Sequence, residues 1–437
     1  MDALMLPSNW QKVRLGDVAE IKRGASPRPI ENPKWFCTNS NVGWVRISDI
    51  SKNSRFLYKT AQKLSKKGIE KSRFIKQNSL IMSMCATIGK PIITKIDTCI
   101  HDGFVVFENP KIDLNYLYYF LCYIEKEWLE SGQQGSQVNL NVDLIKNKEV
   151  FCPKDLNEQI AIANILSDVD RYLYNLDALI LKKESVKKAL SFELLSQRKR
   201  LKDFNQNWQR VRLGDMTTSF TKQTGFDYSA SIKPTLIKEQ LPNYIPFIQN
   251  KDFLGHYINY KTDYFIPNYI PFIQNKDFLG HYINYKTDYF IPNEVAIRFP
   301  QILLNEKCLL ISISGAIGNV AVFNHSQDAF IGGAIAVLKF KEKKSLDFVM
   351  HFLMSVNGQK LLLNSVKSSS HKNLTIADLR DLLIPLPPLN EQIAIANILS
   401  DVDSEIISLK NKKRQFENIK KALNHDLMSA KIRVLKK

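Results

Sequence analysis

The sequence has few of the patterns that mark secreted, membrane-spanning or metal-binding proteins. Its six cysteines are scattered through 437 residues without a Cys-x-x-Cys pair, which argues against a disulfide framework or a zinc site and is typical of reduced thiols in the cytosol. No run of about eighteen apolar residues is present, so no transmembrane helix is expected. Residues 1–9 lack the basic start and apolar core of a signal peptide. We therefore expect a cytoplasmic protein without a membrane partner.

The motifs of enzymes that act on nucleic acids are also missing. Gly89-Lys90 lacks the upstream glycine of a GxxxxGKS/T phosphate loop, and a lysine follows Asn32-Pro33 and Asn109-Pro110 where a methyltransferase tetrapeptide needs a second proline. Glu20-Ile21-Lys22 matches a nuclease E-x-K, but no Pro-Asp precedes it, and a surface strand explains it better. The seven histidines form no metal-binding group. We expect no catalytic residue, cofactor or metal, although dispersed catalytic residues leave a stand-alone DNA methyltransferase or nuclease as an alternative.

Negative charge is in short supply. The chain carries 61 lysines and arginines against 43 acidic residues, which gives a net charge of +18. A polyanion is the expected partner, and nucleic acid is the leading candidate because basic side chains displace condensed counterions from phosphates. The alternatives are an acidic protein partner and, less favoured because no basic amphipathic helix with an aromatic face stands out, an anionic membrane surface.

A fifteen-residue stretch, LNEQIAIANILSDVD, occurs twice without a change, as Leu156–Asp170 and as Leu389–Asp403. Each copy opens a helical pattern and follows a block with a similar start, Asn9–Asp17 in the first block and Asn207–Asp215 in the second. The block starts are 198 positions apart and the helix starts 233, so the second block is 35 residues longer. The chain is therefore a tandem duplication of one unit, a block followed by a helix.

A second, local repeat explains most of the extra length. Pro242–Ile266 recurs at once as Pro267–Ile291, which accounts for 25 of the 35 residues. Two copies are too few for a stacked repeat array. We expect one copy to fill the place that the fold requires and the other to loop out or displace it. Deleting Pro267–Ile291 should therefore leave folding intact or improve it.

Within each block, short β-rich runs alternate with turns and precede one apolar helical segment, which predicts an α/β domain with a mixed sheet. In the first block the expected strands are Val42–Ile47, Ser79–Met84, Ile92–Thr94 and Gly103–Phe107, and the expected helix is Leu114–Leu129. In the second block the expected strands are Cys308–Ser314 and Gly333–Phe340, and the expected helix is Leu346–Met354.

The long helices carry apolar residues at spacings of three and four, which predicts a coiled-coil seam. The expected seam residues are Ile162, Leu166, Val169, Leu173, Leu176, Ile180, Val186, Leu190 and Leu194 in the first helix, and Ile395, Leu399, Val402, Ile406, Leu409, Phe416, Leu423 and Leu427 in the second. Each helix is the natural antiparallel partner of the other, and 40 residues would extend over about 60 Å. Most of the lysines beside the seam are expected to form a solvated flank: Lys182, Lys183, Lys187, Lys188, Lys410, Lys412, Lys413, Lys420 and Lys421.

Taken together, these features resemble the specificity subunit of type I restriction-modification systems over essentially the whole chain. The resemblance rests on the duplicated unit NEQ-x-x-I-A-x-I-L-x-x-x-D, on the block opening W-x-x-V-x-L-G-D, and on their repeated order. The residues that carry it are Asn157–Asp170 and Asn390–Asp403, Trp10–Asp17 and Trp208–Asp215, Gly24–Pro27, Gly43–Arg46 with Asp49-Ile50, Thr224–Tyr228 and Ser314–Asn319.

The resemblance implies an α/β fold with two target recognition domains, joined by two long antiparallel coiled-coil helices. Residues 1–155 and 202–388 would be the recognition domains, and 156–201 and 389–437 the spacer helices. Each domain would read one half of a split, asymmetric double-stranded DNA target. The subunit would be non-catalytic and would dock two methyltransferase subunits, to which ATP-dependent restriction subunits are added. A subunit made defective by the internal repeat remains an alternative.

Loop residues whose types suit base reading are the expected DNA contacts, because arginine pairs with guanine and asparagine or glutamine with adenine. They are Arg28, Lys34, Arg46, Gln134, Ser136 and Gln137 in the first block, and Lys222, Asn319, Ser369, His371 and Lys372 in the second. Trp35 and Trp44 are expected in the core. The helix starts are expected to bind the methyltransferase subunits through Asn157, Glu158, Gln159, Asn390, Glu391 and Gln392.

Overall fold

The computed structural model describes residues 7–51, 55–131, 140–222, 228–235, 269–273, 278–279, 282–283, 290–315, 317–326, 328–365 and 373–434. The chain forms two compact units, the first composed of Met1–Leu176 with Lys413–Lys437 and the second of Asp177–Lys412. Across these described ranges, no helix has both the length and the apolar character needed to cross a membrane.

The first unit contains a two-stranded sheet, β1-β11, a five-stranded sheet in the order β2-β10-β7-β8-β4, and a four-stranded sheet in the order β5-β3-β9-β6. The strands are β1 (Trp10–Arg14), β2 (Glu20–Arg23), β3 (Gly43–Val45), β4 (Phe56–Leu57), β5 (Gln62–Lys63), β6 (Arg73–Ile75), β7 (Leu80–Ser83), β8 (Pro91–Thr94), β9 (Thr98–Ile100), β10 (Phe104–Glu108) and β11 (Glu149–Pro153). Parallel and antiparallel neighbours occur in the same sheet, since β3 runs parallel to β9 and antiparallel to β5. The expected mixed α/β fold is confirmed.

The five-stranded sheet is buried on both faces. Side chains alternate across a strand, so Val105 and Phe107 of β10 face one core while Phe104 and Val106 face another. All four are at most 2 % exposed. This explains why these strands read as continuous apolar runs in the sequence.

Helices and short helical turns surround these sheets: α1 (Leu15–Val18), α2 (Ile47–Ser51), α3 (Lys66–Glu70), α4 (Leu114–Tyr123), α5 (Glu125–Ser131), α6 (Val142–Asn147) and the 3-10 helix η1 (Pro33–Trp35). Two expectations are corrected. The predicted strand through Ile47 stops at Val45, because Asp49 accepts a hydrogen bond from the Arg46 amide and starts α2 instead. The predicted helix Leu114–Leu129 breaks at the buried Ile124, and α5 then brings Trp128 into the core.

The second unit repeats this plan, with the sheets β12-β23, β13-β22-β19-β20 and β17-β14-β21-β18 and an added hairpin, β15-β16. Its strands are β12 (Gln209–Arg212), β13 (Thr217–Lys222), β14 (Tyr269–Ile273), β15 (Phe278–Leu279), β16 (Tyr282–Ile283), β17 (Phe290–Pro292), β18 (Leu303–Leu304), β19 (Cys308–Ser312), β20 (Val320–Phe323), β21 (Ala329–Ile331), β22 (Ile335–Phe340) and β23 (Leu383–Leu386). Its helices are η2 (Leu213–Met216), η3 (Tyr228–Ile232), η4 (Lys233–Thr235), α9 (Asn293–Ala296), α10 (Ser345–Met354), α11 (Val356–Asn364) and α12 (Ile376–Arg380).

The internal repeat enters the second unit through its second copy. β14, which starts two residues into Pro267–Ile291, runs parallel to β21 and antiparallel to β17, as β3 runs beside β9 and β5 in the first unit. The second copy thus occupies the strand position that the duplicated plan requires. The first copy, Pro242–Ile266, lies outside the described residues.

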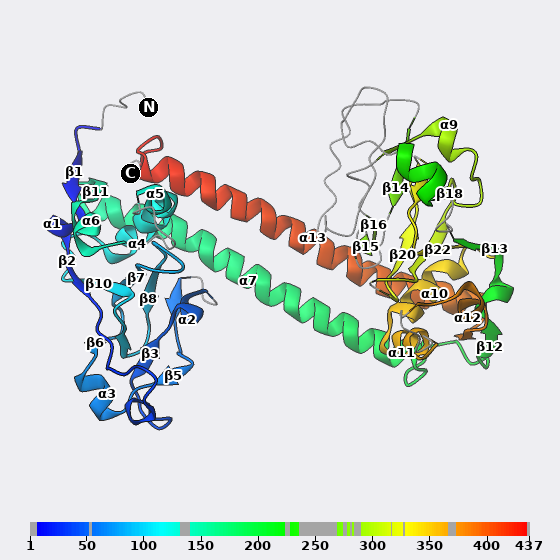
Figure 1. Ribbon diagram of the computed structural model, residues 1–437, viewed down its shortest axis with the longest axis horizontal. Coiled ribbons are helices and arrows are strands. Elements are labelled where there is room, and N and C mark those ends of the chain that lie inside the picture. The colour runs from blue at the N-terminus through cyan, green and yellow to red at the C-terminus, as the bar shows by residue number, and fades with distance from the viewer. Residues whose placement is uncertain are drawn as a thin grey trace. The chain divides into compact units, whose positions relative to one another are not determined.

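Two 40-residue helices, α7 (Leu156–Leu195) and α13 (Leu389–Met428), run antiparallel to each other within each unit (Figure 1). In the first unit, Tyr172 packs on Phe416 at 4.5 Å between ring centroids and Asp170 pairs with Lys420 at 2.5 Å. In the second unit, Glu184 pairs with Lys410 at 2.5 Å. The antiparallel coiled coil expected from the apolar spacing is confirmed.

The centre of the α7 seam differs from its expected composition. Val186 is 40 % exposed, because the three- and four-residue steps that continue from Ile180 arrive at Lys183 and Glu184. Lys183 and Lys187 pair with Glu405 and Asp403 of α13, both across the seam. The solvated flank expected for most of the nine lysines therefore does not include these two or Lys410 and Lys420, which form interhelical ion pairs.

Candidate nucleic-acid interface

One edge of the first unit brings together the ends of three strands, β2, β9 and β10. β2 ends at Arg23, β9 ends at Ile100, and the turn His101–Gly103 leads into β10 at Phe104. The chain after β2 is held against this turn, because the Gly24 amide donates to the Phe104 carbonyl at 2.8 Å and the Ala25 amide to the Ile100 carbonyl at 3.1 Å. A Cβ on Gly24 would lie 2.0 Å from the His101 carbonyl oxygen, so only glycine allows this approach.

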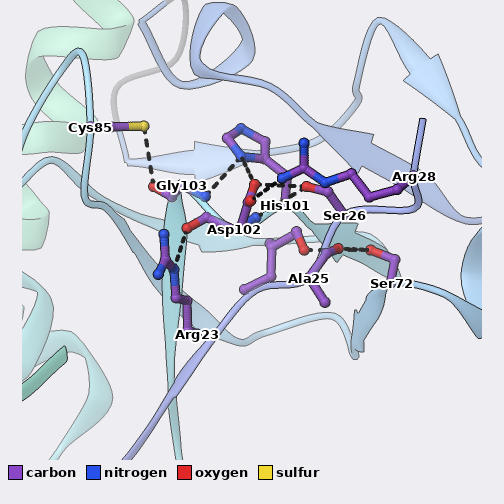
Figure 2. A network of polar contacts seen from close by, with 10 residues as sticks. Arg23, Ala25, Ser26, Arg28, Ser72, Cys85, His101, Asp102 and Gly103 are labelled. Atoms are coloured by element: carbon purple, nitrogen blue, oxygen red, sulfur yellow. Dashed lines mark hydrogen bonds and ion pairs between the residues drawn. The ribbon is translucent and has the colours of Figure 1, made fainter. Parts of the chain in front are cut away.

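Asp102 is the centre of the polar network at this edge (Figure 2). Its Oδ1 accepts from the Ser26 hydroxyl at 2.7 Å, its Oδ2 accepts from Arg28 Nη2 at 2.7 Å, and its backbone carbonyl accepts from Arg23 Nε at 2.7 Å. Partial burial opposes ionisation of Asp102, but the Ser26 hydrogen bond and the Arg28 charge outweigh it and lower the pKa of the carboxyl group. Asp102 is therefore an anion whose carboxylate holds Ser26 and Arg28 of the loop that follows β2.

The neutral imidazole ring of His101 stabilises the turn. Its imidazole packs on Trp44 and Phe104, with ring centroids 5.9 and 4.6 Å away, and its Nδ1 accepts from the Gly103 amide at 2.9 Å. Burial is the main cause that lowers the pKa of His101, and the nearby Arg46 charge adds to it, while Asp102 opposes both. His101 is therefore uncharged at neutral pH and adds no positive charge to this edge.

Arg28, Arg46 and Lys34 are brought to this part of the unit by different elements. Val45 pairs with Ile100 at the carboxyl ends of two parallel strands, so Arg46 follows β3 where His101 follows β9. Lys34 lies in the loop that also carries Arg28, with its ammonium group 4.3 Å from the Trp35 ring centroid. Trp35 and Trp44 are 7 % and 0 % exposed, which confirms that they belong to the core.

The polar loop with Gln134, Ser136 and Gln137 lies outside the described residues. The chain emerges from it at Leu140, whose amide donates to the Met84 carbonyl at 3.0 Å, and the Met84 amide donates to the Gly103 carbonyl at 2.8 Å. The first described residue after that loop is thus fixed next to the turn that carries Asp102.

The second unit has the same edge with different side chains. The Ile313 amide donates to the Ala334 carbonyl at 2.8 Å and the Leu374 amide to the Ile313 carbonyl at 3.0 Å, which repeats the pattern of Gly103, Met84 and Leu140. Lys222 and Asn319 are exposed, at the end of β13 and before β20. Ser369, His371 and Lys372, just before Leu374, lie outside the described residues.

The starts of the two long helices use most of their polar side chains inside their own units. Glu158 accepts from Asn9 Nδ2 at 2.8 Å, and Glu391 accepts from Arg200 Nη2 at 2.7 Å. Gln159 and Gln392, each 3 % exposed, donate to the carbonyls of Pro153 and Pro387. Asn157 and Asn390 are exposed. Among the six residues expected to contact a partner, these two asparagines, one at each helix start, are therefore the ones that are exposed to solvent.

Sequence reasoning missed Asp102 and Ser26, which organise the edge around Arg28. The signal available was a polar His-Asp-Gly turn between two apolar strands, together with the Gly24–Pro27 motif. It also missed Arg55, a buried arginine that bonds Tyr119, Ser167 and Asn115. No cluster of three or more potential metal ligands is found among the residues that the structure describes.

Comparisons with known proteins agree over nearly the whole chain. The family model described as type I restriction modification DNA specificity domain matches residues 7–184 and again residues 205–418. The chain is 25 % identical over 455 residues to the putative type I restriction enzyme MjaX specificity subunit of Methanocaldococcus jannaschii, covering 98 % of this chain and 95 % of that protein. It is 24 % identical over 449 residues to the MjaVIII specificity subunit of the same organism, covering 99 % and 95 %.

Two solved structures share the fold. The S subunit of a type I restriction-modification system from M. genitalium superimposes with a TM-score of 0.58 at 16 % identity, covering 98 % of this chain and 97 % of that one. A chain from a study of complex assembly and conformational transition of the type I R-M system gives a TM-score of 0.54 at 17 % identity, covering 97 % and 98 %. At such low identity these likenesses establish the fold alone.

Proposed function

The chain belongs to the family of type I restriction-modification DNA specificity domains, and from this premise we propose that it is the sequence-reading subunit of a type I restriction-modification complex. It binds a two-part, asymmetric double-stranded DNA target and recruits the subunits that methylate and cut. The observation that carries this proposal is the duplicated edge: the same strand ends recur in both units, but with different side chains on them. A duplicated frame with different edges suits a protein that reads two dissimilar half-sites.

The charge of the chain suits the same task. A net charge of +18 supplies affinity for the phosphate backbone, while a few side chains at base edges supply sequence preference. In the first unit these readers are Arg28, Lys34, Arg46, Gln134, Ser136 and Gln137, and in the second they are Lys222, Asn319, Ser369, His371 and Lys372. The chain itself performs no chemistry on DNA, and the bound adenine methyltransferase supplies that step.

The paired helices are the proposed platform for two methyltransferase subunits, and restriction subunits join that assembly. Both helices start with the same fifteen residues, and each start leaves an exposed asparagine, Asn157 or Asn390. Two identical partners require two matching surfaces, whereas the recognition edges are free to differ. Glu158, Gln159, Glu391 and Gln392 take part by fixing the helix starts on their own units.

The test is a selection and gel-shift experiment with the purified full-length chain, with and without its methyltransferase partner. The chain should enrich a two-part sequence from a randomised duplex library, and its affinity should fall steeply with salt. Methyl transfer or strand cleavage by this chain alone, or the absence of any enriched sequence in the complex, would contradict the proposal.

A further inference from the structure

We infer that Asp102 is a positioning residue that presents Arg28 as a guanine-reading fork in the half-site bound by the first unit. The inference rests on the proposed function and names one base and the two side chains that select it. Arg28 would touch the base, and Asp102 would act through Arg28.

The geometry leaves Arg28 held at one nitrogen and open at the rest. Its Nη2 donates to Asp102 Oδ2 at 2.7 Å, while the side chain as a whole is 70 % exposed. A guanidinium carries five N–H donors, so an exposed fork remains available for a ligand. Asp102 is itself held in place, because Ser26 occupies its other oxygen.

The loop that carries Arg28 is fixed at both ends. On one side, Gly24 and Ala25 bond to the carbonyls of Phe104 and Ile100. On the other side, the Trp35 indole donates to the Pro29 carbonyl at 2.8 Å, and this tryptophan is buried in the core. An arginine on a fixed loop, held by a fixed carboxylate, loses less side-chain entropy on binding than a free arginine would.

The carboxylate also decides what Arg28 can bind. An anionic Asp102 repels a phosphate that approaches the same guanidinium more strongly than it repels a neutral base edge, because the phosphate carries a full negative charge. Guanine offers O6 and N7 as two acceptors in the spacing of an arginine fork. The pair is therefore suited to a guanine in the major groove and unsuited to a backbone contact.

The second unit offers an internal control, because a glycine stands at the position that matches Asp102. Asp102 follows β9 by two residues, and the residue that follows β21 by two is Gly333, which has no side chain to anchor an arginine. Lys222 lies opposite β22 at the same register position that Arg23 has opposite β10. Changes to Asp102 should therefore alter one half-site and leave the other unchanged.

The experiment is a selection from a randomised duplex library with the full-length chain and four variants. Arg28→Ala, Arg28→Lys and Asp102→Asn should each lower the preference for guanine about tenfold at the same single position of one half-site. Arg28→Lys keeps the charge but loses the fork, and Asp102→Asn keeps the shape but loses the anion. Arg14→Ala, which removes an exposed charge on β1 of the same unit, should leave every base preference unchanged.

Each other outcome has a defined meaning. A uniform loss of affinity for all sequences with Arg28→Ala would make Arg28 a phosphate contact and overturn the inference. A lost guanine preference with Arg28→Ala but not with Asp102→Asn would remove the positioning role. A wild-type chain that enriches no two-part sequence refutes the proposed function itself, whereas variants that keep every preference of an enriching wild type refute only this inference. Since Arg28 is mostly exposed, Arg28→Lys should fold normally and keeps the test valid if Asp102→Asn does not.

Discussion

The two units share a backbone arrangement and differ in the side chains at its edge. In both, the same backbone hydrogen bonds hold the edge, through Gly103, Met84 and Leu140 in the first unit and Ala334, Ile313 and Leu374 in the second. A tight turn also recurs: the amides of Gly89 and Gly318, both at positive φ, donate to the carbonyls of Ser83 and Ser312. The turn after the central strand, however, is His101–Gly103 in the first unit and 332–334, Gly-Gly-Ala, in the second. The backbone was duplicated, and the side chains at its edge diverged.

The junction between each unit and its long helices shows the same contrast. Because the fifteen-residue helix start is identical in both units, Ser167 and Asp170 of the first unit correspond to Ser400 and Asp403 of the second. In the first, Tyr119 of α4 donates to Asp170 at 2.6 Å; in the second, His351 of α10 contacts Ser400 at 2.9 Å. One helix motif therefore serves two different partners, a phenol in one unit and an imidazole in the other.

Arg55 should make the first junction the one that depends on a buried cation. Arg55 is 8 % exposed, and its guanidinium donates to Tyr119, Ser167 and Asn115. Arg55→Met should lower the local stability of the first unit by about 2–4 kcal/mol, because one buried and two partly buried acceptors lose their donor. Native-state amide exchange should show faster exchange in β7 and β10 and unchanged exchange in β19 and β22.

Tyr119→Phe is the matched control for the Arg55 variant. It removes one acceptor of Arg55 and the donor to Asp170, but it leaves the cation in place, so its effect should be smaller. Unchanged exchange in β7 and β10 for Arg55→Met, or an acceleration no larger than that for Tyr119→Phe, would show that the guanidinium does not stabilise this junction.

His351 should make the second junction sensitive to acid. Burial lowers the pKa of His351 from 6.5 to about 3, with the Lys187 charge as the smaller cause. Below pH 6.5 the unfolded chain binds a proton that the folded chain does not, so stability is lost as the pH falls toward 3. At pH 5 the loss is about 2 kcal/mol, and His351→Gln should abolish it in calorimetric unfolding at pH 7.5 and 5.

The difference between wild type and His351→Gln isolates this histidine from its neighbours. Asp403, whose pKa is raised mainly by burial, contributes in the opposite direction and is present in both proteins. His425→Gln, at an exposed histidine of α13, is the control and should leave the pH dependence as in the wild type. A His351→Gln protein that loses as much stability at pH 5 as the wild type would remove His351 as the cause.

Local patterns predicted the frame well. Short β-rich apolar runs bounded by turns located β7, β10, β19 and β22, and the three-and-four spacing located both long helices, because these signals are set by neighbours in the sequence. The prediction that Val186 lies in the seam was wrong. Val186 was chosen because it is the next apolar residue after Ile180 in the predicted seam, but the helical period continues through Lys183 and Glu184, which are charged. A period is a more reliable guide than hydrophobicity when interhelical ion pairs replace apolar contacts.

The polar network around Asp102 could not be predicted from the sequence because it depends on long-range pairing. Arg28 and Asp102 are 74 residues apart, and they meet only because β2 pairs with β10 while β3 runs parallel to β9. Arg55 was missed for a different reason: a lone arginine is more often exposed, and only the contacts around it show that it is buried. Arg28 and Arg46 were selected by residue type, and their nearness to one turn is a result of register.

Removing one copy of the internal repeat should bring the second unit closer to the first and have the smallest effect. Because the copies are identical, deleting Pro267–Ile291 or Pro242–Ile266 gives the same protein, and the remaining copy supplies the strand beside β21. The connection from Thr235 to β14 shortens from 33 residues to eight, which should stabilise the unit by about 1 kcal/mol through loop-closure entropy. Thermal unfolding of the deletion variant measures this gain.

A variant that replaces Pro242–Ile266 with a Gly/Ser segment of equal length is the control. A gain in stability there as well would mean that competition between two identical segments, and not the length of the connection, destabilises the unit. An insoluble deletion variant would show that both copies are needed.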